Sequence, residues 1–316
     1  CIGLKQTHKI INDVNASEIV PKDVKVSLNT SFIEPFPRCC IDNKCYECCT
    51  GDRCNDDNYP VLFLHGHAFN KDTSAEYSLD AFNSVQEKLE EGGYINAGAM
   101  SLYLERDTPF RDWGLSPYTI SIGASYYFDL YQKPESFILV ETKSENVDTY
   151  AVKLKELVDN LKYRTGKSKV VLVVHSMGGL VARRYIQIFG ENDVAKLILI
   201  AVPNNGIEGS ILDFCPLKGE KLECRDMSSD SLFMNKLNRA ALPDIPIYNL
   251  IAKGCDMNGE DGDGVVIARK AYLEGAKNQE IKGKCNGFSL FHTQLMDIHE
   301  YPEVYDFVIE SINAVD

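Results

Sequence analysis

A serine lies between a continuous apolar run and a glycine-rich helix start, and this junction constrains the fold more than any other part of the sequence. Residues 170–174 are Val-Val-Leu-Val-Val, and residues 175–179, His-Ser-Met-Gly-Gly, follow directly. Such a run is typical of a strand buried on both faces of a sheet. A sharp turn here would hold the Ser176 hydroxyl clear of the backbone, above the positive end of a helix dipole. The pattern favours a nucleophilic serine over one that only caps a helix.

From about residue 59, short apolar runs alternate with amphipathic segments. The runs predict buried strands, and the periodic segments predict helices. Strict alternation implies a parallel sheet with helices on both faces, which is an α/β fold. The expected strands are 61–64, 97–104, 137–141, 170–174, 197–202 and 247–252, and the expected helices are 75–91, 147–164, 178–189 and 303–312.

Residues 1–58 differ from the rest of the chain, and we expect a small N-terminal module there, with residues 59–316 as the catalytic α/β domain. The first segment contains seven of the eleven cysteines. Two irregular stretches, 105–135 and 207–243, interrupt the alternation. Long irregular connections in compact domains are usually disordered or functional, so we expect lid or cap insertions. For the first stretch the alternative is ordinary core packing by residues such as Trp113, Tyr126 and Phe128.

The cysteines indicate an oxidising compartment, because six of them fall between residues 39 and 54. Adjacent cysteines in a polar, turn-rich segment favour disulfides over a zinc site. Cys215 with Cys224, and Cys255 with Cys285, are further pairing hypotheses. The candidates in the cluster are Cys39, Cys40, Cys45, Cys48, Cys49 and Cys54, whose connectivity the sequence leaves open.

Cys1 is left over once the other ten cysteines are grouped. Bacterial lipoprotein processing leaves a lipidated cysteine at the start of the mature chain, so one interpretation is a membrane tether at Cys1. The alternative is that Cys1 is simply where this stretch of chain begins. Either way we expect an extracytoplasmic protein, secreted or at the cell surface.

Charge and hydropathy argue against two kinds of association. The chain has 33 basic and 46 acidic residues and a formal net charge of −13, so binding to nucleic acid through bulk charge is not expected. The longest apolar runs, 170–174 and 197–202, are too short to span a bilayer.

Residues 175–183, His-Ser-Met-Gly-Gly-Leu-Val-Ala-Arg, resemble the nucleophile elbow of α/β-hydrolase lipases and esterases. The branch of bacterial triacylglycerol lipases, lecithin–cholesterol acyltransferase and GPI-inositol deacylase is the most similar. The likeness extends over roughly residues 59–316 and implies an α/β-hydrolase fold. One departure is Val174, where the family usually has glycine. Residues 201–206, Ala-Val-Pro-Asn-Asn-Gly, also depart at two polar positions, Val202 and Asn204, from the Gly-Thr-Pro-His-x-Gly that the family often has.

The resemblance implies a catalytic triad in the chain order serine, acid, histidine. Ser176 would be the nucleophile. Only His292 and His299 follow it; His292, after an apolar run expected to be a strand, resembles the family's histidine loop, whereas His299 fits a solvated helix start. Asp263, directly before Gly-Val-Val, matches the family's acid position, with Asp261 as the alternative. The acid would accept the Nδ1 proton of the histidine and fix its tautomer.

A tetrahedral intermediate needs two backbone donors. The amide of Met177, directly after the nucleophile, is one candidate, and the resemblance to lipases implies His67, after His65-Gly66, as the other. No metal or cofactor is expected. A metal site at His65 and His67 lacks further ligands nearby in sequence, and a calcium loop at 256–264 is disfavoured because Asp261 stands where an EF-hand requires glycine.

The expected activity is serine carboxylester hydrolysis through an acyl-enzyme on Ser176. Acyl transfer, thioester hydrolysis or amide hydrolysis would use the same triad. A non-catalytic binding protein on a hydrolase fold is a third alternative, against which the complete set of Ser176, Asp263 and His292 argues. The aromatic residues of 105–135 suit an ester with an apolar acyl group, and equally one with an aromatic group.

Overall fold

The structure is a computed structural model that describes residues 38–41, 44–49, 57–67, 75–100, 102, 108, 110–114, 116–132, 137–209, 215, 220–285 and 290–315. The chain divides into two compact units, Cys1–Phe36 and Pro37–Asp316, and the described residues all belong to the second. Cys1 and Cys54 lie outside the described residues. The expected division of the chain at residue 58 stays a prediction.

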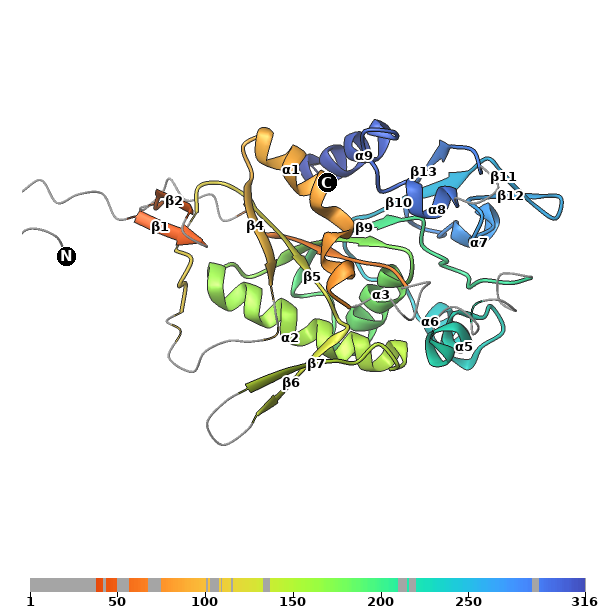
Figure 1. The fold of residues 1–316 in the computed structure, drawn as a ribbon, viewed down its shortest axis with the longest axis horizontal. Helices are drawn as coiled ribbons and strands as arrows, with labels where there is room; N and C mark the ends of the chain where they lie inside the picture. Colours follow the sequence, from red (N-terminus) through yellow and green to blue (C-terminus); the bar gives the residue numbers. More distant parts are fainter. Residues whose placement is uncertain are drawn as a thin grey trace, which may run out of the picture. The chain divides into compact units, whose positions relative to one another are not determined.

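Seven parallel strands form the central sheet, in the order β13-β10-β9-β8-β3-β5-β4 (Figure 1). Val174 near the end of β8 pairs with Leu64 of β3 and with Leu199 of β9, so these central strands end at one edge of the sheet. Loops after such strand ends are where α/β folds build their sites. The strands are β3 (Val61–Leu64), β4 (Ile95–Met100), β5 (Ile120–Ala124), β8 (Val170–His175), β9 (Val194–Ile200), β10 (Ile247–Lys253) and β13 (Lys277–Lys282).

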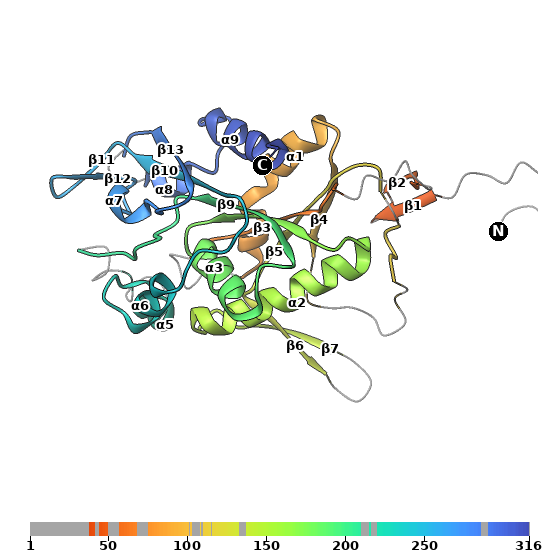
Figure 2. The same ribbon diagram turned by 180° about the vertical axis from the view of Figure 1, so that it is seen from behind.

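Helices cover both faces of this sheet (Figures 1 and 2). Successive side chains of a strand point to opposite faces. Accordingly Leu172 of β8 belongs to one buried cluster, with α2 (Val147–Thr165) and α3 (Met177–Phe189), whereas Val173 belongs to a second, with α1 (Asn83–Glu91) and α9 (Pro302–Asn313). The α/β fold expected from the sequence, with a parallel sheet between two helical layers, is confirmed.

Local sequence explains the longest of these helices. The Asn146 side chain accepts a hydrogen bond from the Thr149 amide (2.8 Å) and so caps the start of α2. At the other end Gly166 adopts a left-handed conformation with φ 69°, which ends the helix. Tyr150, Leu154 and Leu157 are fully buried on one face.

Some elements differ from the sequence expectations. β7 (Phe137–Glu141), expected in the central sheet, instead pairs antiparallel with β6 (Phe128–Gln132) in a separate two-stranded sheet. β5 lies within the stretch expected to be irregular, and β13 was not expected because only Ile281 of that edge strand is buried. The expected helix 75–91 begins as the 3-10 helix η2 (Ala75–Phe82) before α1.

The described part of the 207–243 stretch includes the short helices α5 (Lys221–Met227) and α6 (Leu232–Arg239), and further short elements follow the strands β10 and β13. No helix in the described part of the chain has both the length and the apolarity needed to cross a membrane. The other short elements are β11 (Cys255–Met257), β12 (Glu260–Gly262), α7 (Ala268–Ala271) and α8 (Phe291–Gln294).

Four aromatic side chains described within 105–135 pack against the core, whereas Phe110 and Tyr118 are exposed. Tyr126 and Tyr127 are fully buried, and Phe128 and Trp113 are partly buried against the same cluster. The Arg164 guanidinium, near the end of α2, lies over the Trp113 ring at 5.3 Å. Core packing, the alternative named above, describes these four side chains. A lid or cap role for 105–135 and 207–243 stays a prediction.

Disulfide bonds Cys39–Cys48 and Cys40–Cys45 link the hairpin of β1 (Arg38–Ile41) and β2 (Lys44–Glu47). Cys49 is also disulfide-bonded. The hairpin rests on the larger core, since Ile41 is buried there and the Tyr46 hydroxyl donates a hydrogen bond to the Trp113 carbonyl (2.7 Å). Cys215–Cys224 and Cys255–Cys285 are joined in the two pairings named from the sequence.

Candidate active site

Ser176 lies on the turn between β8 and α3 in a strained backbone conformation, with φ 53° and ψ −128°. Positive φ is uncommon for a residue other than glycine. The turn is held by its surroundings: the Ser176 amide donates to the Ile200 carbonyl (2.9 Å). A Cβ atom at Gly178 would lie 2.4 Å from the His65 carbonyl oxygen, so only glycine lets α3 begin this close to the loop after β3.

Three buried side chains form a hydrogen-bonded chain. The Ser176 hydroxyl donates to His292 Nε2 (Oγ–Nε2 2.8 Å), and His292 Nδ1–H donates to Asp263 Oδ2 (2.7 Å). None of the three is more than 2% exposed. The structure therefore brings together the serine, histidine and acid that the resemblance indicated. The sequence predicted a strand that runs up to His292. This prediction is wrong at Phe291, because Phe291 and His292 begin the one-turn helix α8. Residues 286–289 lie outside the described part of the chain.

Main-chain groups orient the Asp263 carboxylate. Its Oδ1 accepts hydrogen bonds from the amides of Val265 (2.9 Å) and Val266 (2.6 Å), which leaves Oδ2 directed at His292. The alternative acid, Asp261, is exposed, and its carboxylate accepts from the Gly254 amide (2.6 Å) instead. The geometry thus separates two aspartates that lie two positions apart in sequence. His299 is likewise exposed, and its amide donates to Asp297 (3.0 Å).

His175 is a site residue that the sequence analysis did not single out. Burial lowers its pKa well below the ordinary value, so the ring is neutral. Its Nε2–H donates to the main-chain carbonyl of His292 (3.1 Å). The signal available in the sequence was its position directly before the serine.

The loop after β3 passes directly against the serine. A Cβ atom at Gly66 would lie 2.7 Å from Ser176 Cβ. The neighbouring His65 is buried, and burial lowers its pKa to about 3, so its neutral ring donates from Nδ1 to the Gly66 carbonyl (2.7 Å). The Tyr126 hydroxyl donates to the His65 carbonyl (2.8 Å). His67 follows in this fixed loop, and a role for its amide and that of Met177 as oxyanion donors stays a prediction.

Three residues of types that can bind a metal ion, His67, Cys215 and Cys224, lie close together at this loop. Nitrogen or sulfur atoms of His67, Cys215 and Cys224 lie within 4.8 Å of one another. The two sulfurs are joined to each other as a disulfide, and zinc binds cysteine as the free thiolate. In this oxidised form the group has one ligand for a metal ion, the His67 imidazole.

Comparisons with known proteins place the fold. The structure of phospholipase PlaB from Legionella pneumophila matches with a TM-score of 0.51 and 16% identity, over 81% of this chain and 59% of that chain. Its complex with thio-NAD matches with a TM-score of 0.54 and 15% identity, over 81% and 58%. The product of gene lin2722 from Listeria innocua matches with 18% identity and a TM-score of 0.49, over 82% and 95%. No curated protein matched the sequence.

A comparison with protein-family models assigns the family. Residues 130–314, more than half of the chain, match the model of a family described as alpha/beta hydrolase of unknown function (DUF915). The matched stretch includes Ser176, Asp263 and His292. The chain therefore belongs to this family of α/β hydrolases.

Proposed function

We propose that the protein is a serine carboxylester hydrolase that forms an acyl-enzyme on Ser176. The observation that carries the proposal is the unbroken chain from Ser176 Oγ through His292 to Asp263, with contacts of 2.8 and 2.7 Å. A hydroxyl is a weak nucleophile by itself, and an adjacent base oriented by a third group activates it. A serine that only caps a helix needs neither partner.

In the proposed reaction the Ser176 oxygen attacks the ester carbonyl as His292 Nε2 takes the hydroxyl proton. Asp263 stabilises the resulting imidazolium and keeps the ring oriented. The oxyanion accepts hydrogen bonds from the amides of Met177 and His67. Collapse of the intermediate breaks the bond to the alcohol, which leaves with the proton from His292. Water then attacks the acyl-enzyme by the same steps and releases the acid.

The triad does not determine the leaving group, so acyl transfer and thioester or amide hydrolysis are competing activities. We favour esters with an apolar or aromatic acyl part. PlaB is named a phospholipase, which makes lipid esters a class to include in the test. The non-catalytic alternative predicts no turnover of any of these compounds.

The test is hydrolysis of p-nitrophenyl esters of several acyl-chain lengths, with Ser176→Ala as the matched control. Because removal of a triad nucleophile costs several orders of magnitude, we expect kcat to fall at least about a thousandfold. Thermal unfolding of both proteins checks that the variant is folded. Absence of turnover by the wild type, or turnover that Ser176→Ala does not change, would overturn the proposal.

We also propose that the protein works in an oxidising, extracytoplasmic compartment. The Cys215–Cys224 and Cys255–Cys285 disulfides support this, because such bonds persist where thiols are not kept reduced. Mass spectrometry of the protein from its native source tests this proposal: free thiols at the paired cysteines would contradict an oxidising compartment.

A further inference from the structure

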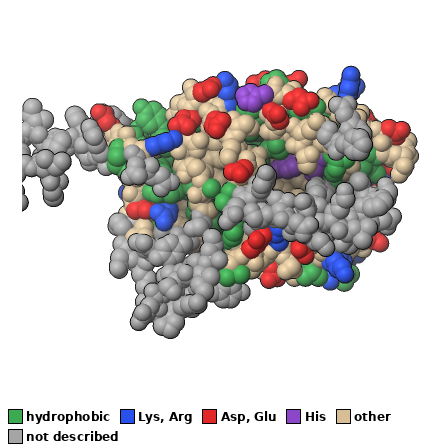
Figure 3. Space-filling model, viewed as in Figure 1, with side chains coloured by type: hydrophobic (Ala, Val, Ile, Leu, Met, Phe, Trp, Pro, Cys, Tyr) green, Lys and Arg blue, Asp and Glu red, His purple; other side chains and the backbone are tan. Residues whose placement is uncertain are grey.

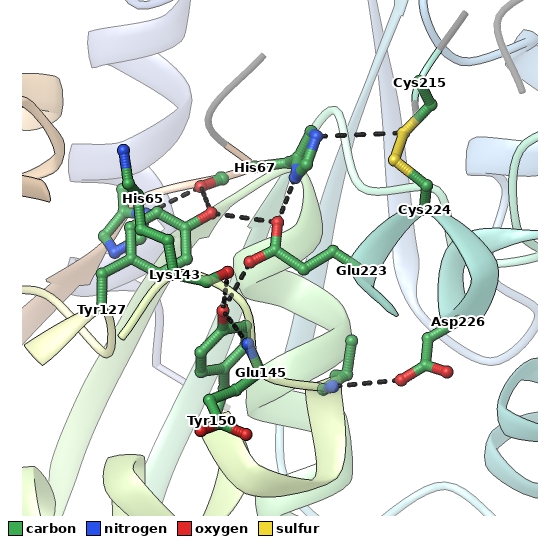
Figure 4. A network of polar contacts seen from close by, with 12 residues as sticks. His65, His67, Tyr127, Lys143, Glu145, Tyr150, Cys215, Glu223, Cys224 and Asp226 are labelled. Atoms are coloured by element: carbon green, nitrogen blue, oxygen red, sulfur yellow. Dashed lines mark hydrogen bonds and ion pairs between the residues drawn. A yellow bond between two sulfur atoms is a disulfide. The ribbon is translucent and has the colours of Figure 1, made fainter. Parts of the chain in front are cut away.

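A buried carboxylate from α5 lies at the centre of a polar network beside the proposed site (Figure 4). Glu223 is 1% exposed. Its Oε1 accepts a hydrogen bond from the Tyr150 hydroxyl (2.6 Å), and its Oε2 accepts from the Tyr127 hydroxyl (3.3 Å) and contacts His67 Nδ1. A buried carboxylate is costly unless it is paired and hydrogen-bonded. The Glu223 carboxylate therefore joins α5 to α2 through Tyr150, to the turn before β6 through Tyr127, and to the loop after β3 through His67.

The other edge of the His67 ring faces the same segment. Its Nε2 lies 3.8 Å from Sγ of Cys215, which is disulfide-bonded to Cys224, the neighbour of Glu223 (Figure 4). The His67 side chain is only 1% exposed. Both nitrogen edges of the imidazole are thus held by groups of the 215–224 stretch, so the ring has little freedom to move.

Gly66 connects the position of the His67 ring to Ser176. His67 directly follows Gly66, whose Cα has no room for a side chain against Ser176. A rotation of the His67 backbone would turn its amide relative to the serine hydroxyl. An oxyanion donor acts only when it is aimed at the place where negative charge develops, and small misplacements are expensive.

We propose that Glu223 is a positioning residue: by holding the His67 side chain, it aims the His67 backbone N–H at the oxyanion formed on Ser176. The inference rests on the proposed function and deepens it. The polar contacts described for the Glu223 carboxylate are with His67, Tyr127 and Tyr150, not with Ser176. Glu223 acts through the imidazole, and α5 of the 207–243 stretch thereby completes the site.

The competing explanation is that Glu223 only holds α5 in place, and Asp226 on the same helix separates the two. Asp226 is also buried, and its carboxylate accepts a hydrogen bond from the Val147 amide at the start of α2 (3.1 Å). Like the contact of Glu223 with Tyr150, this bond anchors α5 to α2, but Asp226 does not contact the His67 ring. Glu223→Gln and Asp226→Asn are therefore matched exchanges of one buried carboxylate for an amide.

The experiment measures kcat and KM for a p-nitrophenyl ester, and the inhibition constant of a trifluoromethyl ketone, whose adduct with a serine carries an oxyanion. Full loss of one oxyanion donor costs about 10²–10³ in kcat, so a misaimed one in Glu223→Gln should cost about ten- to a hundredfold, with KM little changed. Binding of the ketone should weaken by a similar factor. Asp226→Asn should keep kcat and ketone binding close to those of the wild type.

Wild-type kcat and ketone binding in Glu223→Gln, or equal losses in both variants, would overturn the inference. His67→Leu provides a second measurement, decisive if Glu223→Gln does not fold, because it removes Nδ1 and keeps the backbone N–H. We expect His67→Leu to lower kcat and to weaken ketone binding. The double variant with Glu223→Gln should lose no more kcat than either single variant, because both changes act through the same ring. Wild-type kcat in His67→Leu, or additive losses of kcat in the double variant, would contradict the inference. Failure of the proposed function is distinct, because the wild type itself would then be inactive.

Discussion

The Nε2–H group of His175 donates a hydrogen bond to the main-chain carbonyl of His292 (3.1 Å), so the residue before the serine holds the residue that would activate it. The two rings are 4.8 Å apart, and both are buried. The end of β8 therefore sets the positions of Ser176 and His292 together. A small displacement of the end of β8 would therefore move Ser176 and His292 together.

His175→Phe tests this link, because phenylalanine keeps a ring and removes the donor. The His292 carbonyl then loses the hydrogen bond from His175, which should lower the free energy of unfolding by about 0.5–1.5 kcal/mol. If the ring of His292 also loses its orientation, kcat for a p-nitrophenyl ester falls while KM changes little. Urea unfolding and steady-state kinetics give both quantities. Wild-type kcat in a folded variant would show that His175 has no positioning role.

Asp263→Asn and Asp261→Asn form a second matched pair. Asparagine at 263 offers His292 the wrong hydrogen-bonding groups, and the analogous change in serine proteases lowers kcat about 10⁴-fold. We expect a loss of that order, with the protein still folded. Asp261→Asn leaves the hydrogen-bonded chain intact and should keep kcat near that of the wild type. A larger loss of kcat in Asp261→Asn than in Asp263→Asn would indicate that Asp261 is the acid.

Gly66→Ala probes the contact between the loop after β3 and the serine. The added Cβ would lie 2.7 Å from Ser176 Cβ, and the backbone must shift to relieve the clash. Such overpacking costs about 1–3 kcal/mol of stability, and the shift should also lower kcat by moving the His67 amide. Gly92→Ala at the end of α1, where the nearest atom would be 3.2 Å away, is the control and should retain kcat. Equal kcat in the two variants would contradict the close approach.

The buried histidines predict how stability depends on pH. Burial lowers the pKa of His65 to about 3 and that of His175 well below its ordinary value, whereas both titrate near 6.5 in the unfolded chain. Below pH 6.5 the unfolded state thus binds more protons, and the free energy of unfolding falls as pH decreases. The slope from each histidine approaches about 1.4 kcal/mol per pH unit, and the contribution vanishes above about pH 7.5.

Urea unfolding between pH 7.5 and 5 measures this slope. In His175→Phe the slope below pH 6.5 should be smaller than in the wild type by about 1.4 kcal/mol per pH unit. The control is Gly92→Ala, which removes no titratable group and should keep the wild-type slope. An identical slope in wild type and His175→Phe would mean that His175 is charged in the folded protein.

The strands that could be predicted from the sequence are those whose burial produces a continuous run of apolar residues. β8 and β3 are buried throughout, so they appear as continuous apolar runs. β13 buries only Ile281 and leaves no such run, and the β6–β7 hairpin shows the same composition as a sheet strand although it lies outside the sheet. Strand partners are a long-range property that composition does not record.

The candidate site divides in the same way. Ser176, Asp263 and His292 stand in recognisable motifs, so the sequence pointed to them before their contacts were known. Glu223 lies in an ordinary short polar helix, 156 positions from His67 along the chain, and its burial is apparent only once the two are brought together. No local pattern distinguishes such a glutamate from a solvated one.

The distance in sequence between Ser176 and His292, 116 positions, has a consequence for synthesis. A ribosome delivers β3, β8 and the serine turn long before it delivers α8. A nascent or truncated chain that has already assembled the middle of the sheet still lacks His292, the proposed base. In the proposed mechanism, the Ser176 hydroxyl is therefore activated only after the chain has been synthesised past α8 and this helix has packed beside the serine turn.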